Sequence, residues 1–223
     1  DFYFVFYYDK QIVEGGWYTV TVTFADGSSL TKQVRAGTDA GSAQANTGDG
    51  FSVASGIVAV EPEYLVTVNA VGAAMTCGSG GAEVNVNPEL CINGACSALF
   101  SGGDVDGGET YSVTNVGANK NYTVKGHAWL SSCANFNTTY ESTNTAQVKT
   151  LMNGQDAPAL EGFGGQQSLQ EFLNVYLDNS GRTVIAPNQV ILLFELGTTN
   201  TNSTAADFQD MVVLLTIDPV VVQ

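Results

Sequence analysis

The chain has 223 residues, 44% of them hydrophobic, and carries 22 acidic against 7 basic side chains, for a formal net charge of −15. This length and hydrophobic content can supply the core of one large β domain or two small ones. Nucleic acid is not expected as a partner, because contacts to phosphates require clustered Lys and Arg, and seven scattered cations cannot supply them. No run approaches the roughly 20 apolar residues of a membrane-spanning helix, so no membrane span is expected.

The first ten residues are the most unusual segment. They contain an unbroken run of aromatic or β-branched side chains: Phe2, Tyr3, Phe4, Val5, Phe6, Tyr7 and Tyr8. An uncharged run without Pro or Gly is typical of a strand that must be paired and covered, because it otherwise aggregates. The run is the first strand of this chain's own core, a strand donated to a neighbouring copy, or the remnant of a signal sequence. Glu14-Gly15-Gly16 would serve as the flexible joint that donation requires.

A β-hairpin is expected next. Residues 17–24 largely alternate apolar and polar side chains, turn at Ala25-Asp26-Gly27-Ser28, and return through residues 30–34. The small polar loop of residues 37–50 follows. Two apolar strands are then expected, over residues 52–60 and 64–71.

Two of the four cysteines flank the strongest turn signal of the chain. Cys91 and Cys96 enclose Asn93-Gly94, which is typical of a type I′ hairpin turn, and so face each other within reach of a disulfide. Cys77 and Cys133 then form the second disulfide by exclusion. The alternative is four reduced, buried cysteines in a cytosolic protein. The even number of cysteines and the acidic, Thr-rich and Asn-rich composition favour an oxidising, extracellular setting.

Carboxylates cluster in a glycine-rich loop at residues 102–109. Asp104, Asp106 and Glu109 alternate there with four glycines, so the backbone can wrap around a hard cation such as Ca²⁺. The alternative is a solvated Asp-Gly turn. Glu195 with the Asp207–Asp210 segment is a second acidic candidate, and its alternative is a set of strand-end charges that protect a sheet edge.

The second half of the chain continues as strands. They are expected over residues 111–116, 122–130, 145–152, 189–196 and 211–217, the last two apolar enough for the centre of a sandwich. Residues 168–177 are ambiguous, because Ser168 and Glu171 have the spacing of a helix capping box while Leu173, Val175 and Leu177 alternate as in a strand. We expect a brief helical turn followed by a strand.

These patterns predict an all-β chain. Frequent turn signals without βαβ alternation favour a single-domain β-sandwich or jelly-roll-like fold. We expect two parts, an N-terminal apolar strand with its joint (residues 1–14) and the β-sandwich domain (residues 15–223). The N-terminal strand is then shared with a neighbouring subunit.

Three N-glycosylation sequons begin at Asn121, Asn137 and Asn202. Three is about the number that this Asn, Ser and Thr content produces by chance, so the count carries no weight, although the polar surroundings make the sites usable. The chain opens at Asp1 without the basic and apolar regions of a signal peptide, which fits a processed N-terminus or a trimmed chain.

Enzymatic signatures are weak. His127 is the only histidine, which leaves a zinc site short of ligands, and it is expected to satisfy a local hydrogen bond. No GxSxG nucleophile motif is present. Paired carboxylates could still perform glycoside or acid-peptidase chemistry, and would show as two carboxyls with raised pKa values that converge in a cleft. Trp17 and Trp129 could line a sugar-binding face. We expect no catalytic residues.

An apolar leading strand, Phe2 to Tyr8, followed by a disulfide-bearing β-sandwich rich in Gly, Thr and Asn, resembles the subunits of extracellular filaments and sheaths built by donor-strand exchange in archaea and bacteria. The resemblance implies a polymeric fibre at the cell surface, with copies of the chain itself as partners. Copies that carry −15 each repel, so such a polymer needs divalent cations, low pH or screening salt. The alternatives are a secreted binding module or adhesin that recognises glycan or protein, and a viral coat protein.

Overall fold

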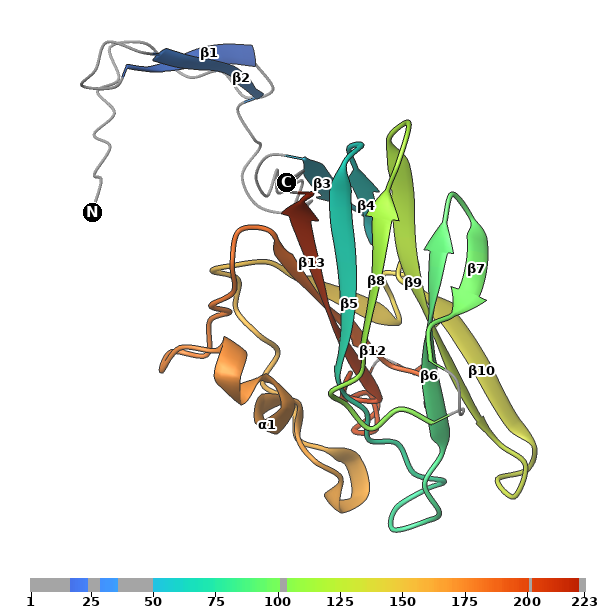
Figure 1. Cartoon of the computed structure of the whole chain (residues 1–223). Helices are drawn as coiled ribbons and strands as arrows, with labels where there is room; N and C mark the ends of the chain where they lie inside the picture. The colour runs from blue at the N-terminus through green and yellow to red at the C-terminus, as the bar shows by residue number, and fades with distance from the viewer. Residues whose placement is uncertain (1–16, 24–28, 36–49, 101–103, 201, 221–223) are drawn as a thin grey trace. The chain divides into compact units, whose positions relative to one another are not determined.

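The computed structural model describes residues 17–23, 29–35, 50–100, 104–200 and 202–220, with side chains from residue 50 onward. It divides the chain into two compact units, residues 1–44 and 45–223 (Figure 1). The aromatic run Phe2–Tyr8 and the domain boundary predicted after residue 14 lie outside the described residues.

The first unit contains the predicted hairpin. Strands β1 (Trp17–Thr23) and β2 (Ser29–Arg35) pair antiparallel, with Trp17 opposite Arg35 and Thr23 opposite Ser29. The alternation of apolar and polar residues therefore identified this hairpin correctly.

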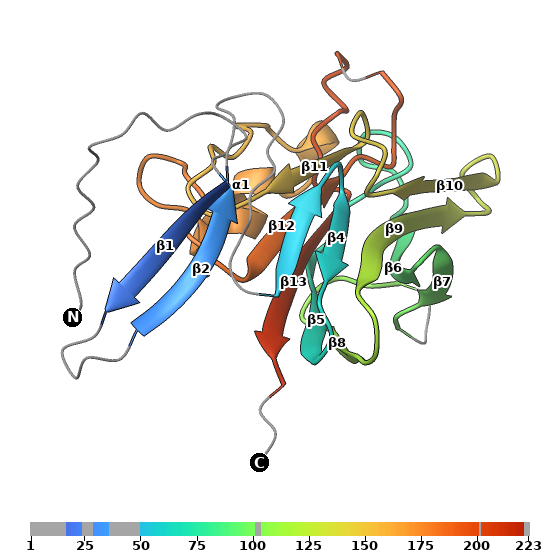
Figure 2. The same ribbon diagram turned by 90° about the horizontal axis from the view of Figure 1, so that it is seen from above.

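The second unit is the predicted β-sandwich, built from two antiparallel sheets (Figures 1 and 2). We name each sheet by its central strand. The β9 sheet has the order β3 (Phe51–Ala54), β4 (Ile57–Val60), β9 (Lys120–Leu130), β6 (Asn85–Ile92) and β7 (Ala95–Ala98), with β10 (Phe136–Glu141) also paired to β9. The β13 sheet has the order β11 (Val148–Leu151), β12 (Gln189–Phe194), β13 (Met211–Pro219), β5 (Tyr64–Gly72) and β8 (Thr110–Asn115).

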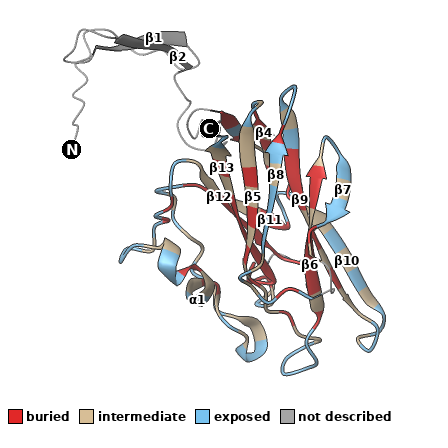
Figure 3. Cartoon of the chain, in the orientation of Figure 1, coloured by how far each residue is buried: buried red, intermediate tan, exposed pale blue. Residues whose placement is uncertain are grey.

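The main apolar core lies between the two sheets (Figure 3). Tyr122 and Val124 of β9 pack in one cluster with Val213 and Leu215 of β13, and all four are completely buried. Removing a side chain of this size from water contributes roughly 1.5 to 3 kcal/mol. Because side chains alternate along a strand, the odd-numbered residues of β9, such as His127 and Trp129, point to the outer face of the β9 sheet.

A second apolar cluster covers the outer face of the β13 sheet. Leu169 and Leu173 of α1 (Leu169–Leu173) are completely buried there, with Ile191 of β12 and Val212 of β13 beneath them. Figure 1 shows α1 on the side of β12 and β13 away from the β9 sheet. Strands β12 and β13 are thus buried on both faces, which explains why their sequences are continuously apolar.

Residues 169–176 are helical and Leu177 forms an isolated β-bridge with Thr183, so the strand predicted after the helical turn is wrong. The Ser168–Glu171 capping box begins α1, and the 3₁₀ turn η2 (Asn174–Tyr176) follows it. Leu169 and Leu173, one helical turn apart, both reach the second cluster, whereas Val175 is 76% exposed. Packing on the β13 sheet therefore favours the helical period over the alternating one. A second 3₁₀ turn, η1, spans Phe163–Gly165.

Two further differences concern strand boundaries. The strand predicted over residues 52–60 is a tight hairpin, β3–β4, because Ser55 and Gly56 adopt positive φ angles and turn the chain. Strand β10 was not predicted at all. Its only large apolar side chains are Phe136 and Tyr140, which pack against the main core, and the residues between them are polar.

Both predicted disulfides are confirmed. Cys91 and Cys96 are bonded and lie opposite each other in the β6–β7 hairpin, whose turn residues Asn93 and Gly94 both have positive φ, as a type I′ turn requires. Cys77, between β5 and β6, bonds Cys133 in the turn from β9 to β10. Two disulfides are compatible with a secreted protein. Among the described residues, no helix has the length and apolar composition needed to cross a bilayer.

Candidate functional site

The acidic loop meets a carboxylate from another part of the chain. Side-chain oxygens of Asp104 and Asp106 lie within 4.8 Å of one another and of Glu83, and all three residues are exposed. Asp104 also accepts a hydrogen bond from the backbone N–H of Val86 at 2.6 Å. The predicted third ligand, Glu109, is not in this group and instead accepts from the N–H of Gly107 at 3.2 Å. Glu83, Asp104 and Asp106, here called the acidic trio, offer the oxygen ligands that Ca²⁺ prefers.

Two other carboxyls, one at each end of the β12–β13 connection, are buried together. Glu195 is completely buried and Asp210 is 4% exposed. The N–H of Gly197 donates to both, to Glu195 Oε1 at 2.9 Å and to Asp210 Oδ2 at 2.8 Å, and Leu196 N–H adds a bond of 2.5 Å to Asp210. These residues are therefore not the exposed sheet-edge charges considered from the sequence.

Backbone N–H groups of the same connection also bind the Glu195 carboxyl. Thr198 donates to Oε1 at 2.8 Å, and Asp207 donates to Oε2 at 3.0 Å. Burial raises the pKa of Glu195. Burial, and then the charge of Glu195, hold the pKa of Asp210 well above its usual range. We infer that Glu195 and Asp210, here called the buried pair, retain a proton where exposed carboxyls are ionised.

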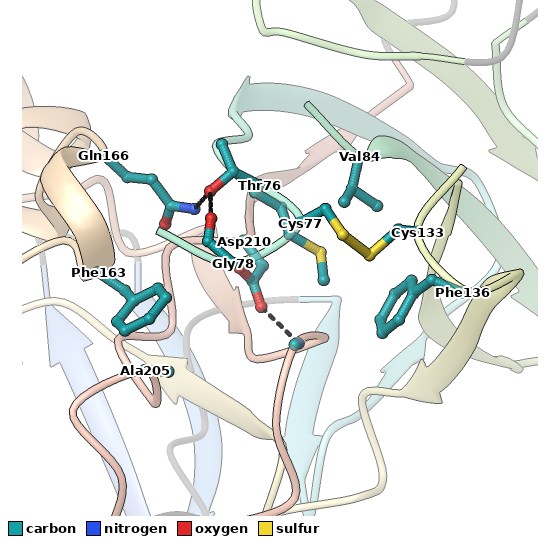
Figure 4. Close-up of a pocket in the computed structure, with 12 residues that line it drawn as sticks. Thr76, Cys77, Gly78, Val84, Cys133, Phe136, Phe163, Gln166, Ala205 and Asp210 are labelled. Carbon is teal, nitrogen blue, oxygen red and sulfur yellow. Dashed lines mark hydrogen bonds between the residues drawn. A yellow bond between two sulfur atoms is a disulfide. The ribbon is translucent and has the colours of Figure 1, made fainter. Parts of the chain in front are cut away.

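A cavity of about 280 Å³ lies beside the buried pair (Figure 4). The Cys77–Cys133 disulfide forms part of its wall, and Phe136, Phe163 and Asp210 line it from other elements. Figure 4 shows the Asp210 carboxyl between the two aromatic rings.

The cavity and the buried pair partly match the signature expected of an acid–base enzyme, namely two carboxyls with raised pKa values at a cleft. However, both oxygens of Glu195 and one oxygen of Asp210 already accept backbone hydrogen bonds, and of these two residues Asp210 alone lines the cavity. Carboxyls fixed in this way hold the β12–β13 connection in place. This bonding favours a structural role for the pair.

A hollow of about 300 Å³ marks the outer face of the β9 sheet. Its lining residues are His127, Trp129, Ser131, Asn135, Phe136 and Asn137. The rings of His127 and Trp129 lie 4.6 Å apart between centroids, and His127 Nε2 shares a hydrogen bond of 2.9 Å with Asn137 Oδ1. The local hydrogen bond predicted for His127 is confirmed. Because β10 was not predicted, the sequence did not reveal that Asn137 joins Trp129 in this aromatic hollow.

The remaining predicted residues fall in several places. The sequon residues Asn121, Asn137 and Asn202 are all exposed, in β9, in β10 and in the β12–β13 connection. Trp17 belongs to β1 of the first unit and Trp129 to β9 of the second. Glycosylation of the three sequons and a sugar-binding face formed by the two tryptophans stay predictions.

Strand β8 is an edge without charge. Among the described strands it pairs with β5 alone, and residues 110–119 contain no Asp, Glu, Lys or Arg. Two of its exposed side chains are large and apolar, Tyr111 at 39% exposed and, directly after the strand, Val116 at 69%. Natural edge strands are normally protected by charged residues, so this edge is open to pairing with another strand.

Comparisons of this chain with models of protein families, with curated proteins and with solved structures found no match.

Proposed function

We propose that this chain is a structural subunit of an extracellular filament, sheath or surface layer, and that it polymerises by adding its Phe2–Tyr8 strand to a sheet edge of a neighbouring copy. One observation carries the proposal. The β9 and β13 sheets, and both apolar clusters of the described residues, are made from residues 51–219. A sandwich that closes with its own strands leaves the aromatic run available for another copy.

Strand β8 is the acceptor that this proposal favours. Its six residues are close in length to the seven-residue aromatic run, and its outer edge has no described strand beside it. An incoming strand would form ladder hydrogen bonds along this edge, and Tyr111 and Val116 would lose exposed apolar surface. The two disulfides support placing the assembly outside the cell.

The test removes the donor and the acceptor separately. A chain that lacks residues 1–10 should be folded by circular dichroism and monomeric by light scattering, whereas the full chain should form large particles once salt screens its charge. Val116→Lys should also reduce assembly, because it places a charge beside the open edge. The matched control is Val184→Lys, at a residue that is 58% exposed and lies away from β8.

Three outcomes would contradict the proposal. The full chain could remain monomeric at neutral pH in salt, or the shortened chain could still polymerise. Unfolding of the shortened chain would show instead that the aromatic run belongs to its own core. If Val116→Lys and Val184→Lys reduced assembly equally, β8 would not be the acceptor, and the aromatic run would have to pair with another sheet edge.

The second candidate function is a secreted binding module or adhesin. The aromatic hollow favours it, because a half-buried aromatic wall with amide and hydroxyl groups beside it suits a sugar or a protein side chain. This function predicts a monomer with saturable binding of one ligand, measurable on a glycan panel with Trp129→Ala as the negative control.

A further inference from the structure

The sequon at Asn137 differs from the other two in its surroundings. Asn137 of β10 lies directly opposite Trp129 of β9, so the two side chains emerge on the same face of the sheet. Both line the aromatic hollow. By contrast, Asn121 lies opposite Ala59 in the β4–β9 register, and Asn202 lies in the β12–β13 connection.

The Asn137 side chain is already oriented within the hollow. Its Oδ1 shares a hydrogen bond of 2.9 Å with His127 Nε2, which directs the amide so that the nitrogen is the end without a described partner. This nitrogen is the atom that carries the sugar in N-glycosylation. Thr139, the third residue of the sequon, is exposed and lies opposite His127.

We propose that Asn137 is N-glycosylated and that the first sugar of its glycan, an N-acetylhexosamine, packs on the Trp129 indole inside the hollow. In the modification, the amide nitrogen attacks the anomeric carbon of a lipid-diphosphate-linked oligosaccharide supplied by the host. The new C–N bond replaces the C–O bond to the diphosphate, which leaves, and the amide proton passes to a base of the transferase.

The hollow suits this occupant for three reasons. The indole presents a flat apolar surface to the C–H face of a pyranose ring. Ser131 and Asn135 provide hydroxyl and amide groups for the polar edge of the sugar. The sugar is bonded to a residue that lines the hollow, so it reaches the indole ring without the loss of translational and rotational freedom that a free ligand would suffer.

This proposal does not depend on polymerisation. It competes with the second candidate function, because a hollow filled by the chain's own glycan is closed to a free ligand.

The experiment uses the full chain secreted from a eukaryotic host, with the occupancy of each sequon measured by glycopeptide mass spectrometry. Asn137 should be occupied. Thr139→Ala removes the sequon, and should lower the melting temperature by about 2 to 4 °C. Two controls accompany it: Thr139→Ser keeps the sequon, and Asn202→Gln removes a glycan that has no aromatic hollow, and neither should change the melting temperature.

A double-mutant cycle links the effect to the ring. In a Trp129→Ala background, Thr139→Ala should no longer change the melting temperature, while a Trp129→Phe background should retain part of the effect. In protein made without glycosylation, wild type and Thr139→Ala should melt together. In nuclear magnetic resonance spectra, the protons of the first sugar should show upfield ring-current shifts that Trp129→Ala abolishes.

Several results would overturn the proposal. One is an empty Asn137, whether or not Asn121 and Asn202 are occupied. Another is an occupied Asn137 for which Thr139→Ala changes the melting temperature equally with and without the Trp129 indole. Saturable binding of N-acetylglucosamine by the unglycosylated protein, together with an empty Asn137, would assign the hollow to a free ligand instead.

Discussion

The acidic trio and the buried pair show that carboxyl side chains behave differently at the surface and in the interior of the same domain. In the trio, Glu83, Asp104 and Asp106 are exposed, so water stabilises their charges and they can attract a cation. In the buried pair, Glu195 and Asp210 are removed from water, which raises the pKa of both carboxyls, and the charge of Glu195 raises that of Asp210 further. The number of carboxylates in a segment therefore says little about its chemistry. Solvent exposure and nearby backbone donors decide it.

The largest effect should come from deleting one member of the buried pair. Asp210→Ala leaves the N–H of Leu196 without its acceptor and the N–H of Gly197 with Glu195 alone, and should lower the free energy of unfolding by about 3 kcal/mol. Asp106→Ala in the trio is the matched control and should change it by less than about 1 kcal/mol, because that residue is exposed. Urea denaturation measures both, and equal losses would contradict the distinction between the two clusters.

Local patterns predicted most of the sandwich from the sequence. Continuous apolar runs identified β12 and β13 because burial on both faces removes any need for alternation. Asn93-Gly94 identified the cysteine hairpin because few residues other than Gly and Asn accept the positive φ angles of its turn. In both cases the physical cause lies within a few residues of the feature.

The candidate sites were harder to predict because they depend on contacts between distant segments. Glu83 joins Asp104 and Asp106 only once the chain has folded, and it lies too far from them in the sequence for a local pattern to predict the contact. Asn137 reaches Trp129 through β10, a strand whose polar composition hid its alternation. The burial of Glu195 depends on backbone donors of the β12–β13 connection, and every residue type except proline could supply those donors.

The next effect is on the pH dependence of stability. Groups with raised pKa values, such as the buried pair, are protonated in both states below the ordinary carboxyl pKa of about 4, so their stabilising contribution is fully present there. The contribution is lost as the pH rises through the higher pKa values of the folded state. The free energy of unfolding should therefore decline from weakly acidic pH upward, and Asp210→Asn should flatten that decline.

Two exposed carboxyls have the opposite effect on the pH dependence of stability, because their lowered pKa values make the folded state less stable at low pH. Backbone bonding to Ser168 lowers the pKa of Glu171, and a side-chain bond from Ser180 lowers that of Asp178. Their contributions exist above the ordinary carboxyl pKa and are lost as the pH falls below it. Urea denaturation at closely spaced pH values should thus show a maximum in the acidic range. Stability that rose steadily toward neutral pH would contradict a retained proton in the buried pair.

The smallest effect should come from calcium at the acidic trio. Each of the three carboxylates offers one oxygen to a shared ion, fewer than the six to eight that Ca²⁺ takes, so water must complete the shell and binding should be weak. Calcium at ten times its dissociation constant should stabilise the chain by about 1.4 kcal/mol. Asp106→Asn should abolish this gain while Asp210→Asn leaves it intact, as measured by melting temperature with calcium or with a chelator. Magnesium, which binds reluctantly to sites of this openness, is the control cation, and an equal gain from both ions would indicate general screening of the −15 charge and no defined site.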